Sequence, residues 1–220
     1  MNSNYDYQKE ANISALFEEQ EYSERKDALK ALLEAFEKAN VKYALACSFN
    51  LFIRGIVDEF HDFDFIVSAE SIPAVKVIME KMNAILVATG GNGYCESDQY
   101  FHYQLGRIDV DIISGFKILT FGTQIYYSYD PGQIETVETY EEGMLPIPLI
   151  PLEELFLLYG MMEGWQPKRK FKRVLIMEAL KESPTLMFSE ILEESLKEEL
   201  PGWLKREVRK LLKNRSKRQE

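Results

Sequence analysis

The chain has 220 residues, 46% of them hydrophobic, and a formal net charge of −10, so it can bury a sizeable core but is not suited to general nucleic-acid binding. It has no apolar window of the roughly 18 residues that a membrane span needs, and its first residues lack the basic-then-apolar pattern of a signal peptide. Only two cysteines occur, Cys47 and Cys95, so we expect no disulfide framework and a cytoplasmic location.

The first 145 residues alternate expected helices and strands. The first helix is predicted at residues 9–40, where apolar side chains recur at helical spacing, as in Leu29, Leu32, Leu33 and Phe36. Two further helices are expected at residues 48–55 and 68–83. Apolar and aromatic runs predict strands at residues 41–47, 63–67, 84–89, 100–106, 107–114, 116–122 and 124–130.

The rest of the chain has a helical pattern. Amphipathic spacing predicts helices at residues 151–163, 169–182, 187–198 and 202–217, with prolines between them. We therefore predict two domains, residues 1–145 with helices and strands and residues 146–220 as a helical bundle. The last stretch is basic, with eight Lys or Arg against two Glu in residues 203–220. It could hold a polyanion, but a solvated helix face is the preferred interpretation.

The stretch EFHDFDFIV, residues 59–67, puts two carboxylates on an otherwise apolar strand. Because side chains alternate along a strand, Asp62 and Asp64 face one way and Phe63 and Phe65 the other. Two negative charges within about 7 Å repel each other, whereas a hard divalent cation such as Mg²⁺ binds carboxylate oxygens. Taken alone, the pair fits a solvent-exposed strand end better than a metal site, because such short motifs are common.

A second expected strand repeats the pattern. In GRIDVDII, Asp109 and Asp111 share one face, while Ile108, Val110 and Ile112 share the other. If the two strands are neighbours, four carboxylates converge, and such a cluster requires a cation at neutral pH. The repetition therefore favours a metal–nucleotide site over two solvent-exposed strand ends.

The order of these elements resembles the nucleotidyltransferase superfamily, which has the polymerase-β-like fold. The strand YALAC is followed by Ser48 at the start of a short helix, then by thirteen residues and DFDFIV, with a further Asp on a later strand. The family signature is a hydrophobic strand, Gly then Gly or Ser, about nine to thirteen residues, and Asp–hydrophobic–Asp or Glu. The resemblance covers residues 28–120, and PIPLIPLEELFLLYG is similar to the start of the helical domain in small antibiotic- and toxin-type members. It implies an α+β fold, a mixed sheet flanked by helices and followed by a C-terminal helical bundle.

The resemblance also implies a reaction. The protein would be a Mg²⁺- or Mn²⁺-dependent nucleotidyltransferase that moves a nucleoside monophosphate from an NTP, such as ATP, to a hydroxyl of a small molecule or protein. Asp62, Asp64 and Asp111 would be the catalytic, metal-holding carboxylates, with Asp109 the less favoured choice for the third. Ser48, at the start of its helix, would contact the nucleotide phosphates.

The expected phosphate-binding side departs from the family pattern. The family glycine before the serine is Cys47 here, and a basic residue before the D-x-D pair is represented only by His61 or, further upstream, Arg54. These three residues and Ser48 form the expected nucleotide-binding set. The departures leave a second interpretation open, a catalytically weakened nucleotidyltransferase-fold protein that acts as a binding or regulatory module. We expect no membrane or nucleic-acid partner, and we leave a homodimer open.

Overall fold

The computed structural model describes residues 20–90, 96–122, 125–129, 135–137, 146–165, 167–182 and 188–216. The first part of the predicted helix at residues 9–40, Cys95 and the last four residues of the chain lie outside the described residues. The described residues form two compact units. One takes in those within Met1–Gly91, Ser97–Phe116 and Asp130–Ile150, and the other takes in those within Asn92–Glu96, Lys117–Tyr129 and Pro151–Glu220.

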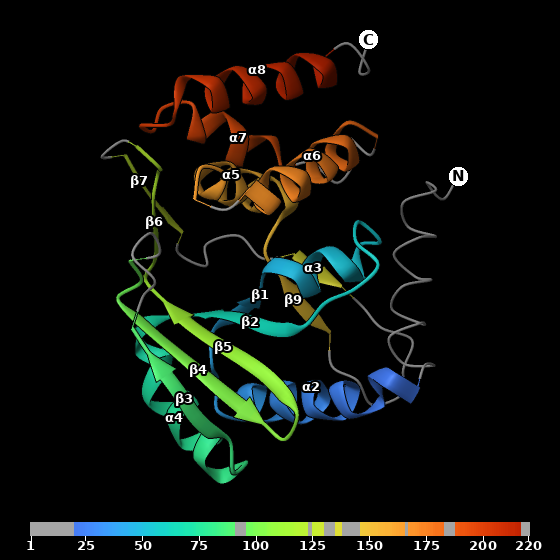
Figure 1. The fold of residues 1–220 in the computed structure, drawn as a ribbon, viewed down its shortest axis with the longest axis vertical. Coiled ribbons are helices and arrows are strands. Elements are labelled where there is room, and N and C mark those ends of the chain that lie inside the picture. The colour runs from blue at the N-terminus through green and yellow to red at the C-terminus, as the bar shows by residue number, and fades with distance from the viewer. Residues whose placement is uncertain are drawn as a thin grey trace. The chain divides into compact units, whose positions relative to one another are not determined.

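The first unit is built on a mixed sheet, which has seven strands among the described residues, in the order β3-β4-β5-β2-β1-β9-β8 (Figure 1). The strands are β1 (Tyr43–Leu45), β2 (Asp62–Val67), β3 (Ile85–Thr89), β4 (Gln99–Leu105), β5 (Ile108–Ser114), β8 (Glu135–Val137) and β9 (Ile147–Leu149). β2 and β5 run parallel, as do β1 and β9, and the other neighbours are antiparallel. The predicted α+β fold with a mixed sheet is confirmed.

Aromatic packing decides which face of β2 joins the hydrophobic core. The helical elements of this unit are α2 (Gln20–Lys38), α3 (Cys47–Ile53), η1 (Ala69–Ser71) and α4 (Ile72–Lys81). Phe65 of β2 meets Phe36 of α2 edge to face, with 5.2 Å between ring centres. Phe63 meets Phe49 of α3 in the same way at 5.0 Å. Because both phenylalanines belong to the core, the carboxylates that alternate with them are turned to the opposite face.

The segment before α5 (Leu152–Met162) differs from the prediction, which gave residues 146–220 a wholly helical pattern. Ile147–Leu149 forms strand β9, and Leu149 pairs with Leu45 of β1 in parallel. Prolines at positions 146, 148 and 151 explain the difference, because each disfavours the helical conformation of the residue before it. Strand β8, which pairs with β9, was likewise not predicted.

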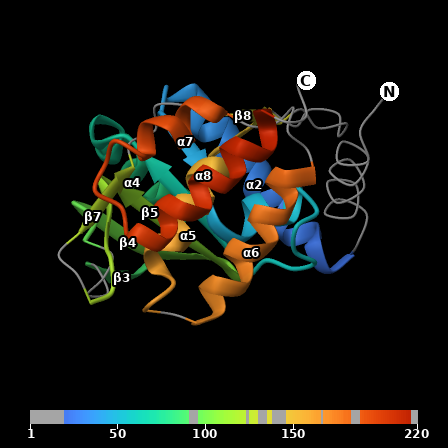
Figure 2. The same cartoon turned by 90° about the horizontal axis from the view of Figure 1, so that it is seen from above.

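The second unit combines a hairpin with helices. The hairpin is formed by β6 (Phe116–Leu119) and β7 (Tyr126–Tyr129), and the helices are α5 (Leu152–Met162), α6 (Pro167–Glu182), α7 (Ser189–Ser195) and α8 (Gly202–Ser216). Every residue of α5 is buried, and the helix packs against α6 and α7 (Figure 2). A Cβ at Gly160 would lie 2.8 Å from the end of the Leu204 side chain of α8, so a larger residue would require that side chain to shift. The predicted C-terminal helical bundle is confirmed.

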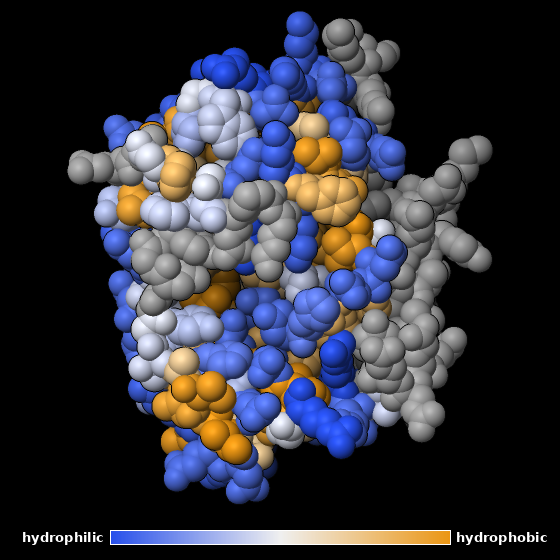
Figure 3. Space-filling view, viewed as in Figure 1, coloured by the Kyte–Doolittle hydropathy of each residue, from blue (hydrophilic) through white to orange (hydrophobic). Residues whose placement is uncertain are grey.

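Two surface features complete the description. None of the helices within the described ranges is long and apolar enough to cross a membrane. β3 is an edge strand, and Ile85, Leu86 and Val87 on it are 49–63% exposed. They contribute to the apolar patch visible over β3 in Figure 3.

Candidate functional site

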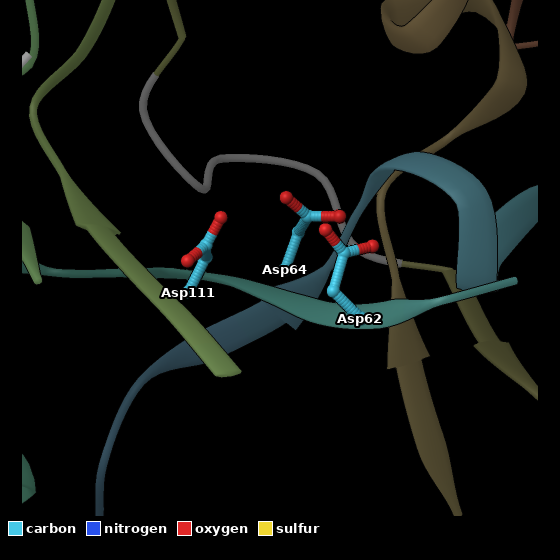
Figure 4. Close-up of side chains that lie close together, drawn as sticks. All are labelled: Asp62, Asp64 and Asp111. Carbon is cyan, nitrogen blue, oxygen red and sulfur yellow. The ribbon is translucent and has the colours of Figure 1, made fainter. Parts of the chain in front are cut away.

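Sheet register brings the two D-x-D pairs side by side. β2 and β5 pair in parallel, with Asp62 opposite Asp109 and Asp64 opposite Asp111. Carboxylate oxygens of Asp62, Asp64 and Asp111 all lie within 4.8 Å of one another (Figure 4). Among the described residues this group does not include Asp109, whose side chain is 50% exposed. The sheet thus gathers three of the four carboxylates that the sequence singled out.

Asp111 is contacted by two side chains of a third strand. His102 and Tyr100, both on β4, contact the same carboxylate oxygen of Asp111: His102 Nδ1 lies 2.7 Å from Oδ1, and the Tyr100 hydroxyl donates to it at 3.0 Å. Burial raises the pKa of Asp111, and the negative charge of Asp62 adds to this, while the contacts with His102 and Tyr100 act in the opposite direction. Burial and then the Asp111 carboxylate raise the pKa of Tyr100, so its hydroxyl keeps its proton at neutral pH.

Ser48 follows β1, the neighbour of β2 on the edge away from β5, and its side chain contacts Asp62 from there. Its Oγ donates to Asp62 Oδ1 at 3.2 Å. The backbone holds the two segments in this relation, because the N–H of Ala46 donates to the carbonyl oxygen of Asp64 at 2.9 Å. The turn from β1 into α3 therefore presents the serine hydroxyl beside the acidic pair.

Cys47 has a backbone conformation that glycine adopts far more easily. Its φ is 52°, in the left-handed region, where an L-residue brings its Cβ too close to the backbone. It stands at the first position of α3, directly before Ser48. This is the position at which the family signature described above has a glycine, so the chain keeps the turn but with a half-buried thiol in it.

Arg54 and His61 occupy different environments. Arg54 is 1% exposed, and its guanidinium donates from Nε to Asn50 Oδ1 at 2.7 Å and from Nη2 to the carbonyl oxygen of Ile150 at 3.2 Å. This enclosure does not favour the phosphate contact expected from the sequence. His61 is 76% exposed and lies 3.8 Å from Glu59. Arg54 is therefore a buried residue that donates hydrogen bonds to Asn50 and Ile150. His61 is an exposed residue directly before β2.

The donor set of the carboxylate group fits a hard divalent cation. Asp62, Asp64 and Asp111 offer oxygen atoms alone, which suits Mg²⁺ or Mn²⁺ better than a metal that prefers nitrogen or sulfur. The mutual repulsion of three carboxylates within 4.8 Å is relieved when a cation lies between them. The residues present thus fit a metal ion.

Comparison with known proteins adds to this geometry. No protein-family model and no curated protein sequence matches the chain. The solution structure of the antibiotic-resistance factor ANT(2'')-Ia is 17% identical, with 74% of this chain and 89% of that chain covered and a TM-score of 0.51. Its crystal structure in complex with adenylyl-2''-tobramycin is 13% identical, with 77% and 93% covered and a TM-score of 0.52. The chain has the nucleotidyltransferase fold. A Thermotoga maritima protein assigned as a nucleotidyltransferase agrees, with 17% identity, 74% and 94% covered and a TM-score of 0.50.

The nucleotidyltransferase fold confirms the resemblance expected from the D-x-D spacing, and at these identities the likeness concerns the fold. Two residues of the site lay outside that reasoning, His102 and Tyr100. Their alternation on one strand was visible in the sequence, but their partner was not. Only the antiparallel pairing of β4 with β5 sets His102 directly opposite Asp111.

Proposed function

We propose that the protein is a nucleotidyltransferase that requires a divalent metal ion and transfers a nucleoside monophosphate from an NTP to a hydroxyl of a small molecule or protein. The observation that carries the proposal is the convergence of Asp62, Asp64 and Asp111 within 4.8 Å on a nucleotidyltransferase fold. A solved structure with this fold is a complex with adenylyl-2''-tobramycin, which supports adenylyl or related transfer as the reaction class. A cytoplasmic location is part of the same proposal.

The residues of the site would take three roles in this reaction: metal binding, phosphate contact and proton transfer. Asp62, Asp64 and Asp111 would hold the ion, Mg²⁺ or Mn²⁺. A bound divalent ion neutralises negative charge on the triphosphate and favours attack at its α-phosphorus. Ser48, whose hydroxyl lies beside Asp62, would contact a phosphate oxygen.

Asp111 is the proposed general base. It would take the proton of the acceptor hydroxyl as that oxygen forms a bond to the α-phosphorus. The bond from the α-phosphorus to its bridging oxygen breaks in line, and pyrophosphate leaves with the electron pair.

The test is calorimetric titration of each common NTP, with Mg²⁺ or Mn²⁺, into the wild-type protein and Asp64→Asn. We expect the wild type to bind at least one NTP in a metal-dependent way and the variant to bind it at least about tenfold more weakly, because one anionic ligand is lost. Asp58→Asn is the matched control, since Asp58 is an exposed aspartate just before β2. Absence of metal-dependent binding of any NTP to the wild type would overturn the proposal.

A second function follows from the phosphate side of the site. Cys47 stands in the left-handed turn, and Arg54 is enclosed in the core, so the phosphate grip differs from the family pattern. These observations favour a catalytically weakened member that acts as a binding or regulatory module. A screen with α-labelled NTPs and mixed small-molecule and protein acceptors separates the two, because the module would transfer no label.

A further inference from the structure

We propose that His102 is a positioning residue that selects Asp111, rather than Asp109, as the third carboxylate of the metal site. The proposal rests on the proposed function, since it assigns a residue to the same site. Asp109 and Asp111 share one face of β5, so the strand by itself offers both. A neighbouring side chain must make the choice.

One imidazole ring lies between the two β5 carboxylates. Nδ1 of His102 is 2.7 Å from Asp111 Oδ1, and Nε2 is 3.6 Å from Asp109 Oδ1. The ring is largely enclosed, with a side chain that is 26% exposed, and Asp111 is 16% exposed against 50% for Asp109. His102 thus contacts Asp111 directly through Nδ1, whereas Asp109 lies beyond hydrogen-bond distance of Nε2 and stays more exposed, outside the group that Asp62 and Asp64 form with Asp111.

Tyr100 completes the hold on Asp111. Its hydroxyl donates to Oδ1 of Asp111, the same oxygen that faces His102 Nδ1. The torsion that turns an aspartate carboxylate is broad, so a rotamer preference alone does not orient it. Two partners on Oδ1 do orient it, and they leave Oδ2 as the oxygen for a cation or an acceptor hydroxyl. Outer partners of metal-binding carboxylates typically change metal affinity 10- to 100-fold.

A purely structural role makes a different prediction. If His102 only joined β4 to β5, its removal would lower stability and leave metal affinity unchanged per folded molecule. If it positions Asp111, metal affinity falls in protein that remains folded. A residue at the equivalent place in the ladder gives the comparison: Gln104 is on the same face of β4, lies directly opposite Asp109 and is exposed.

The experiment measures Mn²⁺ binding to the full chain by calorimetry or electron paramagnetic resonance, with circular dichroism to report the folded fraction. We expect His102→Ala to weaken Mn²⁺ binding about 10- to 100-fold and Gln104→Ala to leave it unchanged. His102→Asn should recover most of the affinity, because an asparagine amide nitrogen can take the place of Nδ1 beside Asp111. Tyr100→Phe, which removes the second partner, should weaken binding several-fold. His102→Leu, which fills part of the space of the ring without a nitrogen, takes the place of His102→Ala if that variant does not fold, and it should weaken binding to the same extent.

The outcomes separate this proposal from the one before it. Wild-type Mn²⁺ binding with equal affinity in folded His102→Ala or folded His102→Leu overturns the role of His102 and leaves the proposed function standing. A wild-type protein that binds no Mn²⁺, alone or with an NTP, overturns both.

Discussion

Cys47 connects backbone strain to the site, because it holds a φ of 52° at the first position of α3. The left-handed conformation costs an L-residue about 1–2 kcal/mol. Ser48 follows immediately and donates to Asp62. The left-handed turn is therefore maintained by the surrounding core, because Ala46 and Phe49, which flank Cys47 and Ser48, are buried. It forms against the conformational preference of Cys47 itself.

Cys47→Gly is expected to stabilise the protein. Relief of the left-handed strain exceeds the entropy that a glycine loses on folding, so the free energy of unfolding should rise by about 0.5–1 kcal/mol. Denaturant unfolding followed by circular dichroism measures the change. Cys47→Ala is the control, since it removes the thiol and keeps the strained Cβ. A glycine variant less stable than the alanine variant would contradict the explanation.

The site residues differ in how far the sequence could reveal them. Asp62 and Asp64, and the pair Asp109 and Asp111, were predictable as candidates, because like charges at alternate positions of an apolar strand repel each other and destabilise it unless a cation is bound. His102 and Tyr100 were not, because their relation to Asp111 depends on a strand pairing between distant segments. Arg54 was predicted at the phosphates as a basic residue before the acidic pair. Its burial against Asn50 depends on packing that no local pattern encodes.

Strands β1 and β2 show how a period of two residues divides core from site. Phe63 and Phe65 of β2 pack against aromatic rings of α2 and α3. A slip of one residue in the register would exchange the phenylalanines and the aspartates, so the core enforces the position of the carboxylates. Tyr43 of β1 belongs to the same aromatic group, with its ring centre 5.2 Å from Phe36 and 5.7 Å from Phe65.

Tyr43 should make the protein sensitive to alkaline pH. Burial, with a further contribution from the charge of Glu37, raises the pKa of Tyr43 well above its ordinary value. Above about pH 10 the unfolded chain releases the tyrosine proton and the folded chain does not, so the free energy of unfolding falls as the pH rises through that range. Below the ordinary pKa both states keep the proton, and the contribution is fully present.

The variant Tyr43→Phe should therefore lose less stability than the wild type between pH 8 and pH 10.5. Urea unfolding at the two pH values measures the difference. The fall will not vanish, because burial also raises the pKa of Tyr100 and Tyr103. Tyr126→Phe, at a 43% exposed tyrosine, is the control. An equal loss of stability in Tyr43→Phe and the wild type would show that this ring does not carry the effect.

At the scale of the whole chain, the second unit is discontinuous in sequence. The hairpin β6–β7 belongs with the C-terminal helices: Trp165 Nε1 donates to the carbonyl oxygen of Leu119 at 2.7 Å, and Thr120 Oγ1 donates to Met161 Sδ at 3.2 Å. Phe121 meets the Trp165 ring edge to face at 5.0 Å. We therefore propose that the two domains coincide with the two compact units and that the hairpin β6–β7 is part of the helical domain.

Residues 151–220 alone should fold less stably than in the full chain. Without the hairpin, the fragment lacks the partners of Trp165 and Met161 and leaves apolar surface of a small core exposed. Thermal unfolding followed by circular dichroism should show a broad, early transition for the fragment and a cooperative one for the full chain. Trp165→Phe in the full chain, which removes the bond to Leu119, should show a smaller loss, about 1 kcal/mol. A fragment with the same sharp transition as the full chain would contradict the discontinuous unit.

Local periodicity was enough to predict the helices, most strands and the two acidic strand faces, because periods of 3.6 and 2 residues are properties of short stretches of the chain. The nucleotidyltransferase fold was also expected, because the segment with Ser48, Asp62 and Asp64 resembles the signature of that superfamily. The tertiary structure alone decided that Asp111 and not Asp109 joins the carboxylate group, that His102 and Tyr100 hold it, and that β8 and β9 extend the sheet. These features depend on pairing between segments far apart in the chain, where packing and register override local preference.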